Sequence, residues 1–363
     1  MKKLFVFVVV VSVLNVTNAE EVYVDANYSG SLVTGSKARP FKSFAGFSLK
    51  SGQNIFIKRN SIINSQIYIA GISNIAISSY GEGNKPVINL DYKHDHGIKL
   101  VSAHNVVISN IRIINAGTSC VQVIGSKMFS ISKLECSHSI YGVQVNDGKY
   151  NSTGEVVNSV ISHVQGDGIG AWSLREGILI KKNVISHFGN DGIDVLGSYG
   201  SIIDGNIVHD SFDSFNADGS PKAEGRGISH VGIKAGGNRG NGGGRNVVRN
   251  NVVYNVKNFG IFNRHAVYNI YDSNRCYNNG VNFNFVKSDG PSMATIINNV
   301  SEGASFEAGL KYDVFIPRSS DLIRADNNRW VDPLINVKGI GVISDLSVYR
   351  EKMAPFEANT VFH

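Results

Sequence analysis

The sequence predicts an all-β protein folded as a right-handed parallel β-helix with a short N-terminal capping helix. Short runs rich in Val and Ile alternate with Gly, Asn, Ser and Asp, and the chain has 39 glycines but only 7 prolines. Residues 159–170 align without gaps with residues 183–194, an offset of 24 residues. A period in the low twenties is what one coil of a parallel β-helix requires. A leucine-rich solenoid does not fit because the repeat has no leucine frame, and a β-sandwich does not fit because long alternating hairpins are missing.

The first nineteen residues predict a secretory signal peptide that is cleaved after Ala19. Lys2 and Lys3 precede an apolar stretch over residues 4–14, and Thr17 and Ala19 are the small residues that a signal peptidase prefers. The apolar stretch is much shorter than the ~20 residues that cross a bilayer, although an uncleaved membrane anchor is the alternative. We therefore expect a secreted protein, extracellular or periplasmic, with no membrane contact after cleavage. We also expect a monomer.

The rest of the chain is expected to be one β-helix domain over residues 20–345. Residues 22–27 and 39–44 are interpreted as a first strand followed by a short helix, which ends near Leu49 and covers the open end of the core. Residues 346–363 are expected to form an irregular tail that packs across the far end.

A Gly-(Ile/Val)-x element marks one strand of each coil. It begins at Gly97, Gly142, Gly168, Gly192, Gly232 and Gly260. Strand alternation predicts that its central residue points into the core and that both flanking residues point to solvent.

A second signature places Asn before two apolar residues. It occurs at Asn183, Asn206 and Asn251, with a weaker match at Asn274. Asn residues at one corner of successive coils can stack as a hydrogen-bonded ladder, so we predict a structural role for these four. The same is expected of His163 and His187, which also repeat at the 24-residue period.

Charge and cysteine content limit the possible functions. The formal net charge of +6 falls to +4 once the signal peptide and its two lysines are removed. This small positive net charge is only weak evidence for an acidic substrate, because binding depends on the electrostatic field in the groove and not on the total charge. Nucleic acid is a poor candidate partner, since there is no Lys/Arg run or basic motif interleaved with aromatic residues. Cys120, Cys136 and Cys276 have no zinc-ligand spacing; we expect buried free thiols, with a Cys120–Cys136 bridge as the alternative.

The repeat is interrupted after Gly192. The interval from Gly192 to Gly232 is 40 residues, whereas the neighbouring intervals are 24 and 28 residues. One coil has therefore gained a loop within residues 210–230, and a glycine-rich excursion over residues 235–245 follows the next strand. Long loops on a solenoid usually line a binding groove.

Acidic residues gather beside this interruption. Asp167 and Asp191 hold the same repeat position, and Asp194 shares its column with Lys234. Together with Asn190, the three carboxylates are expected to form one outward cluster within two coils. Carboxylates this close repel one another unless a cation lies among them, and calcium accepts irregular shells of oxygen ligands. The simpler alternative is that the Asp-Gly pairs only build corners and that Lys234 is a solvated surface lysine.

These motifs resemble polysaccharide lyase family 9, whose members are similar to pectate lyases and fold as right-handed parallel β-helices. The resemblance is carried by residues 166–170, 189–195, 232–237 and 249–255, and it extends over about residues 156–285.

The resemblance implies a calcium site and a lysine base. Carried over by position, the Ca²⁺ ligands are Asp167, Asn190, Asp191 and Asp194, and the catalytic base is Lys234. The family usually has Asp where this chain has Asn190, which removes a charge but keeps an oxygen ligand. Calcium on the C6 carboxylate of a uronate would stabilise the enolate formed when neutral Lys234 removes the C5 proton. The expected activity is calcium-dependent β-elimination on an acidic polysaccharide such as pectate or rhamnogalacturonan.

Basic residues near the site are candidate substrate ligands. They are Arg226, Arg239, Arg245, Arg264 and His265. The guanidinium fork matches a carboxylate bidentately, so the arginines are expected to hold the flanking carboxylates of the substrate.

Other functions stay open at this point. A non-catalytic glycan-binding β-helix is favoured by Asn190 and by residues 260–266, which depart from the family's Asp- and Asn-rich version. A mannuronan C5-epimerase would begin with the same proton removal and then add a proton from the opposite face, but no second acid is evident. A hydrolase of the polygalacturonase type would need two carboxylates with water between them and would not need Lys234.

Overall fold

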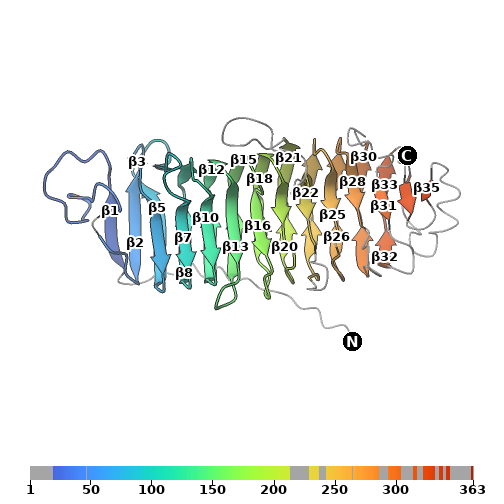
Figure 1. The fold of residues 1–363 in the computed structure, drawn as a ribbon, viewed down its shortest axis with the longest axis horizontal. Coiled ribbons are helices and arrows are strands. Elements are labelled where there is room, and N and C mark those ends of the chain that lie inside the picture. Colours follow the sequence, from blue (N-terminus) through green and yellow to red (C-terminus); the bar gives the residue numbers. More distant parts are fainter. Residues whose placement is uncertain are drawn as a thin grey trace.

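Every regular element of the described chain is a β-strand. The computed structural model describes residues 19–45, 47–212, 229–236, 243–263, 265–285, 293–303, 314–316, 322–331, 335–337, 341–343 and 361–362. Their strands form three sheets of twelve strands each, and within each sheet the strands follow one another along the long axis of the molecule (Figure 1). The chain passes from the first sheet to the third, then to the second, and back to the first, so successive coils add one strand to each sheet. The predicted parallel β-helix is therefore confirmed.

The strands of each sheet follow one another along the axis. The first sheet contains β1 (Glu20–Val24), β2 (Gln53–Lys58), β5 (Ser73–Tyr80), β8 (His104–Ser109), β11 (Lys127–Ser132), β14 (Thr153–Val157), β17 (Leu179–Lys181), β20 (Ile202–Asp204), β23 (Val247–Arg249), β26 (Ile270–Asp272), β29 (Ala294–Ile297) and β32 (Leu322–Asp326). The second sheet contains β4 (Ile67–Ala70), β7 (His96–Val101), β10 (Ser119–Ile124), β13 (Tyr141–Asn146), β16 (Ile169–Trp172), β19 (Asp191–Asp194), β22 (Val231–Lys234), β25 (Phe259–Phe262), β28 (Val281–Asn284), β31 (Val314–Ile316), β34 (Ile335–Val337) and β35 (Gly341–Ile343). The third sheet contains β3 (Ile62–Ile63), β6 (Val87–Asn89), β9 (Arg112–Ile114), β12 (Glu135–Ser139), β15 (Val160–Val164), β18 (Val184–Phe188), β21 (Ile207–Ser211), β24 (Val252–Tyr254), β27 (Arg275–Tyr277), β30 (Val300–Glu302), β33 (Arg329–Val331) and β36 (Val361–Phe362). Neighbouring strands pair in parallel, whereas the last pair of the second sheet, β34 and β35, is antiparallel.

The core consists of aliphatic columns that run along the axis. Ile169, Ile193, Ile233 and Ile261 are in register on successive strands of the second sheet, and all four are fully buried. They are the central residues of the Gly-(Ile/Val)-x element, and they point inward as predicted.

The glycine before each central residue does not face solvent, contrary to the prediction. A Cβ atom on Gly168 would lie 2.5 Å from Ile185, and one on Gly192 would lie 2.3 Å from Val208. Ile185 and Val208 belong to the third sheet, which meets the second sheet at this corner. At Gly168 and Gly192 a larger residue is excluded because a β-branched side chain of the neighbouring sheet already fills the space.

Asparagine side chains form the predicted ladder at one corner. Asn183 donates from Nδ2 to Asn206 Oδ1 at 3.0 Å, and the same contact links Asn206 to Asn251 and Asn251 to Asn274, each at 2.9 Å. The ladder continues from Asn274 to Asn299. The side chains of Asn183, Asn206, Asn251 and Asn274 are buried, and each Nδ2 also donates to a backbone carbonyl. These asparagines therefore satisfy the polar groups of the corner.

Histidines of the same period form a second stack. The ring of His163 lies parallel to that of His187 at 4.6 Å and to that of His138 at 5.4 Å. The three rings lie on the outside of the third sheet, which agrees with the expected structural role for His163 and His187.

The front end is closed without the predicted helix, which is a correction. The described residues between 39 and 49 form bends and a turn. Phe41 stacks on Phe47 at 4.5 Å, Phe44 lies 5.5 Å from Phe47, and these rings pack with Leu49 against the core. A segment this short gains too few helical hydrogen bonds to offset nucleation. Aromatic side chains cover the open end instead.

Cys120 and Cys136 form a disulfide, where free thiols were expected. The bond joins β10 to β12, and the two Cα atoms are 6.0 Å apart. In the next coil the corresponding residues are Gly142 and Ile161. The two cysteines therefore meet in the space that a glycine and a β-branched residue share elsewhere. Cys276 is a buried free thiol, as expected.

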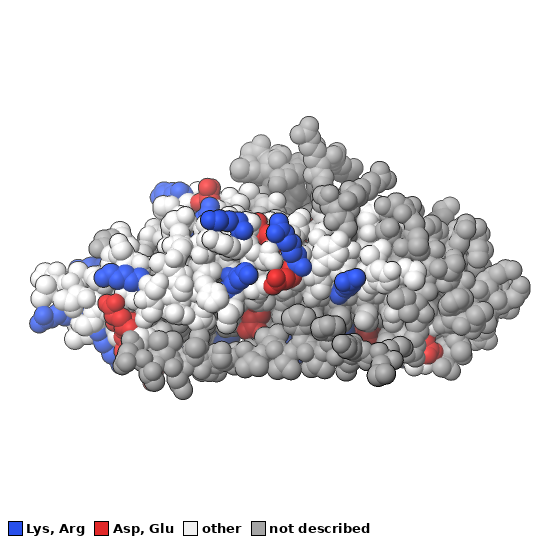
Figure 2. All heavy atoms as spheres, turned by 90° about the horizontal axis from the view of Figure 1, so that it is seen from below, with Lys and Arg blue, Asp and Glu red and all other residues white. Residues whose placement is uncertain are grey.

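The predicted signal peptide and tail fall mostly outside the described residues, which begin at Ala19 and exclude 344–360. Val361 and Phe362 extend the third sheet by pairing with β33. Among the described residues, no helix has the length and apolar character needed to cross a membrane. On the face drawn in Figure 2, the Lys and Arg side chains of this part of the chain lie among Asp and Glu side chains instead of forming a patch of one sign.

Candidate functional site

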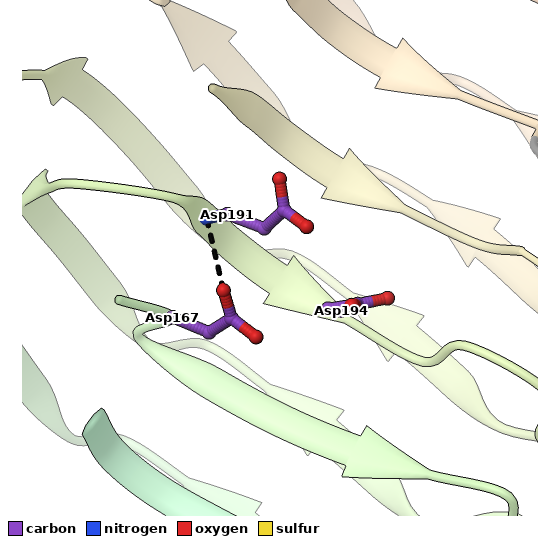
Figure 3. A group of neighbouring side chains, drawn as sticks. All are labelled: Asp167, Asp191 and Asp194. Atoms are coloured by element: carbon purple, nitrogen blue, oxygen red, sulfur yellow. Dashed lines mark hydrogen bonds between the residues drawn. The ribbon is translucent and has the colours of Figure 1, made fainter. Parts of the chain in front are cut away.

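Three carboxylates meet where the second sheet carries β16 and β19. Asp167 precedes β16, and Asp191 and Asp194 begin and end β19. One oxygen of each lies within 4.8 Å of the other two, and the side chains gather on one side of the sheet (Figure 3). The expected cluster is therefore present. It is buried and not open to solvent, because Asp167, Asp191 and Asp194 are only 2%, 0% and 3% exposed.

Backbone and hydroxyl donors orient these carboxylates. The Asp191 N–H donates to Asp167 Oδ1 at 3.1 Å (Figure 3). Asp191 Oδ1 accepts from the Ser229 hydroxyl and from the Val231 N–H, the latter at 3.2 Å. Asp194 Oδ1 accepts from the Leu196 N–H at 3.0 Å. These donors stabilise the ionised carboxylates and fix the directions in which their remaining oxygens point.

Lys234 reaches the cluster from the next coil. It is in register with Asp194 on the paired strands β19 and β22, which confirms the shared column. Its Nζ donates to Asp191 Oδ2 and to Asp194 Oδ2, the latter at 3.1 Å. Lys234 is only 4% exposed, so it is not a solvated surface lysine.

The cluster shifts the pKa values of Asp167, Asp194 and Lys234. Burial, together with the charges of Asp191 and Asp194, raises the pKa of Asp167 well above its usual value. Burial also raises the pKa of Asp194 to about 6, against the opposing charge of Lys234. Burial alone would lower the pKa of Lys234, but the charges of Asp191 and Asp194 outweigh it and raise the pKa overall. In this arrangement protonated Lys234 is the cation among the carboxylates.

The donor set fits a hard divalent cation. Asp167, Asp191 and Asp194 are the one group of three or more His, Cys, Asp or Glu side chains placed to hold a metal within the part of the chain that the structure describes. All three offer carboxylate oxygens, the ligands that calcium and magnesium prefer, and there is no thiolate or imidazole to favour zinc.

Asn190 touches the cluster through its amide nitrogen. Its Nδ2 donates to Asp167 Oδ1 at 2.6 Å, while its Oδ1 accepts from the Ser229 N–H at 2.8 Å. Rotation of the amide group would be needed to turn the oxygen toward the carboxylates. The role of Asn190 as a metal ligand therefore stays a prediction.

Ser229 and Trp172 belong to the site although the sequence did not reveal them. Trp172 donates from Nε1 to Asp194 Oδ2 at 3.3 Å. The sequence did contain one indication of the position of Trp172. Gly170 shares the column of Asp194, and a residue without a side chain there leaves room for the indole ring. Ser229 lies in the interruption of the repeat, where no register predicts its position.

The predicted substrate ligands are only partly within the described residues. Arg226, Arg239 and Arg264 lie outside them. Arg245 is exposed in the connection between β22 and β23, and its backbone N–H donates to the backbone carbonyl of Val267 at 2.9 Å. His265 is partly buried in the turn after β25. Their part in substrate binding stays a prediction.

No family model matches the chain, and no curated protein matches its sequence. Similar solved structures include a rhamnogalacturonan lyase, with a TM-score of 0.59, 14% identity, and coverage of 85% of this chain and 87% of the other. The pectate lyase Pel9A has a TM-score of 0.60, 18% identity, and coverage of 85% and 79%. The A-module of the Azotobacter vinelandii mannuronan C-5 epimerase AlgE6 has a TM-score of 0.60, 13% identity, and coverage of 96% and 91%. Identities this low show a shared fold, and membership of polysaccharide lyase family 9 stays a prediction.

Proposed function

We propose that this chain is a secreted, calcium-dependent polysaccharide lyase that cleaves an acidic, uronate-containing polysaccharide by β-elimination. The buried contact of Lys234 with Asp191 and Asp194 supports this most directly, because the proposed base and the proposed metal ligands are then neighbours. A shared fold with lyases of pectate and rhamnogalacturonan adds support.

The carboxylates of Asp167, Asp191 and Asp194 would hold the calcium ion, with Asn190 adding its amide oxygen after rotation. With all three carboxylates ionised and Lys234 neutral, as a base must be, the formal charge of the group is −3, and a divalent cation would offset two of these charges. Calcium bound there would supply positive charge to the uronate carboxylate and to the enolate that forms from it.

Lys234 would act as the base that removes the C5 proton. A base must be neutral, and the carboxylates of Asp191 and Asp194 hold the proton on Lys234 as long as their charges are uncompensated. A cation bound to these carboxylates would neutralise the charges that raise the pKa of Lys234, and like-charge repulsion would favour the neutral amine. The C5–H bond then breaks toward Nζ, its electron pair forms the C4–C5 double bond, and the C4–O4 bond breaks with O4 leaving as an alkoxide that takes a proton from water.

A mannuronan C5-epimerase is the second candidate, because the same proton removal begins that reaction and an epimerase module shares the fold. In epimerisation the proton returns to C5 from the opposite face and the polymer stays intact. The two reactions are therefore separated by their products.

The test uses the mature chain with polygalacturonate, rhamnogalacturonan and alginate, each with calcium or with a chelator. We expect ultraviolet absorbance from unsaturated uronate ends on one polymer, present with calcium and absent with chelator. Inverted C5 centres in uncleaved alginate, detected by NMR, would support the epimerase instead. Absence of both products on every polymer would refute both enzymes and favour a glycan-binding protein.

A further inference from the structure

Two aromatic side chains lie beside the carboxylate cluster and offer neither a metal ligand nor a base. Trp172 ends β16, and Tyr141 begins β13 in the preceding coil. Their rings meet edge to face, with centroids 5.6 Å apart and planes at 79°. Both side chains are partly exposed, although the neighbouring Asp194 is buried. They therefore form the accessible border of a buried site.

The indole of Trp172 lies flat across Gly170. Gly170 is in register with Gln144 on one side and Asp194 on the other, so it is the one residue of this stretch of the column without a side chain. A Cβ atom on Gly170 would lie 2.3, 2.6 and 2.9 Å from Cζ2, Cε2 and Cη2 of Trp172. Near-equal distances to three consecutive ring atoms indicate a ring that covers the glycine with its face. The opposite face of the indole is then directed away from the sheet.

A hydrogen bond fixes this indole next to the cluster. Trp172 Nε1 donates to Asp194 Oδ2 at 3.3 Å, and the same oxygen accepts from Lys234 at 3.1 Å. The outward face of the indole is thereby held one coil away from the proposed metal ligand.

Aromatic side chains also border the other side of the site. Phe262 is in register with Lys234 on the next coil, and its ring lies 4.9 Å from that of Phe259. Both phenylalanines are partly exposed. Along the axis the order is therefore Trp172, Asp194, Lys234 and Phe262, one per coil, which spans roughly 14 Å at the usual strand spacing.

We propose that Trp172 is a sugar-stacking platform next to the carboxylate cluster, and that an acidic glycan lies along the axis from Trp172 toward Phe262. A pyranose ring has an apolar face of C–H bonds and a polar edge, and an indole offers a large rigid apolar face at little entropic cost. The inference deepens the proposed function and rests on it for the ligand class, which is a chain of uronate pyranoses. Trp172 selects and positions a sugar ring; the chemistry takes place one coil further along.

Tryptophan fluorescence tests this directly, because the chain has 2 tryptophans and the other, Trp330, is fully buried. The Lys234→Ala variant is titrated, with calcium present, with trigalacturonate, trimannuronate, triguluronate and a rhamnogalacturonan tetrasaccharide. We expect a saturable change in emission with one of these ligands and none with the Lys234→Ala/Trp172→Phe double variant. No change with any of the four ligands would overturn the inference.

Kinetics separate stacking from mere positioning of Asp194. If the ring stacks on sugar, Trp172→Ala raises KM by roughly tenfold and leaves kcat within about twofold, whereas Trp172→Phe keeps KM within about threefold. If Trp172 acts only through its hydrogen bond to Asp194, Trp172→Phe and Trp172→Ala lower the activity equally and the decrease is in kcat. That result would overturn the stacking role of Trp172. An emission change without unsaturated product from any polymer would refute lyase activity and support the stacking role of Trp172. Unsaturated product without an emission change would support lyase activity and refute the stacking role.

Discussion

Lys234 and Asp194 occupy the same column of the second sheet on adjacent coils, and Lys234 Nζ lies 3.1 Å from Asp194 Oδ2. A lysine that would act as a base is thus also the counter-ion of the carboxylates that would bind the metal. A calcium ion held by Asp191 and Asp194 would therefore compete electrostatically with Lys234 for these carboxylates, and such competition would have measurable consequences.

Replacing Lys234 by Met should destabilise the metal-free protein and tighten calcium binding. The buried carboxylates lose their cation, so we expect the free energy of unfolding in chelator to fall by about 3 kcal/mol. Calcium should restore this loss and bind more tightly than to wild type. Urea denaturation with and without calcium, together with calorimetric titration, measures both effects. Lys181→Met is the matched control, since Lys181 is half exposed and lies 3.5 Å from Asp204 outside the cluster. Equal effects of the two variants would contradict the account.

Replacing Asn190 by Asp should trade stability for metal affinity. The amide that donates to Asp167 Oδ1 at 2.6 Å becomes a fourth carboxylate, so the melting temperature in chelator should fall. Calcium affinity should rise by roughly tenfold, because ligand charge tunes calcium sites. Asn255→Asp makes the same change at an exposed contact with Asp210 Oδ1, 2.7 Å away, and should leave calcium binding unaltered. An Asn190→Asp protein that binds calcium no better than wild type would remove Asn190 from the ligand set.

Loss of the Cys120–Cys136 disulfide should lower stability by about 3 kcal/mol, the usual value for a loop of this size, which spans 16 residues. We expect Cys120→Ser/Cys136→Ser to unfold at lower urea concentration. Cys120→Gly/Cys136→Ile should retain more stability, because it reproduces the Gly142 and Ile161 pair of the next coil. A wild-type protein with the same urea midpoint with and without reductant would contradict a stabilising bond.

Asp204 should make stability depend on pH in acid. Burial alone would raise its pKa, but hydrogen bonds from Asn250 and Arg249 and the charges of Arg249 and Lys181 lower it overall. A group whose pKa is lower in the folded state stabilises the protein above its unfolded pKa, and this contribution is lost as the pH falls through the folded pKa. Asp204→Asn should therefore melt a few degrees lower than wild type at pH 7, and the difference should be smaller at pH 2, toward the lowered folded pKa of Asp204. Calorimetry at both pH values is the check, and an equal difference at the two would contradict the assignment.

The repeat period was sufficient to predict the fold and the main columns of the site. In a parallel coil the register follows from the alignment of repeats, so Asp194 and Lys234 could be placed in one column, and Asp167 could be matched with Asp191. The burial of these groups was not predictable, because it depends on packing across several coils.

Other features escaped for identifiable reasons. The disulfide was only the alternative to free thiols, although Cys120 stands in the glycine column, where it faces Cys136 across a corner. The prediction of a capping helix was wrong because burial of Phe41, Phe44 and Phe47 stabilises this segment more than a short helix would. Trp172 was missed because its direction depends on the gap at Gly170, which is a property of side-chain packing and not of the repeat.

The rate of unsaturated product formation by Lys234→Ala, measured with saturating calcium on the polymer that wild type cleaves, tests the central claim most directly. Circular dichroism would establish that the variant is folded. We predict that the rate falls by at least about a hundredfold, since the C5 proton loses its base. A folded Lys234→Ala protein that cleaves the polymer at the wild-type rate would contradict the assignment of Lys234.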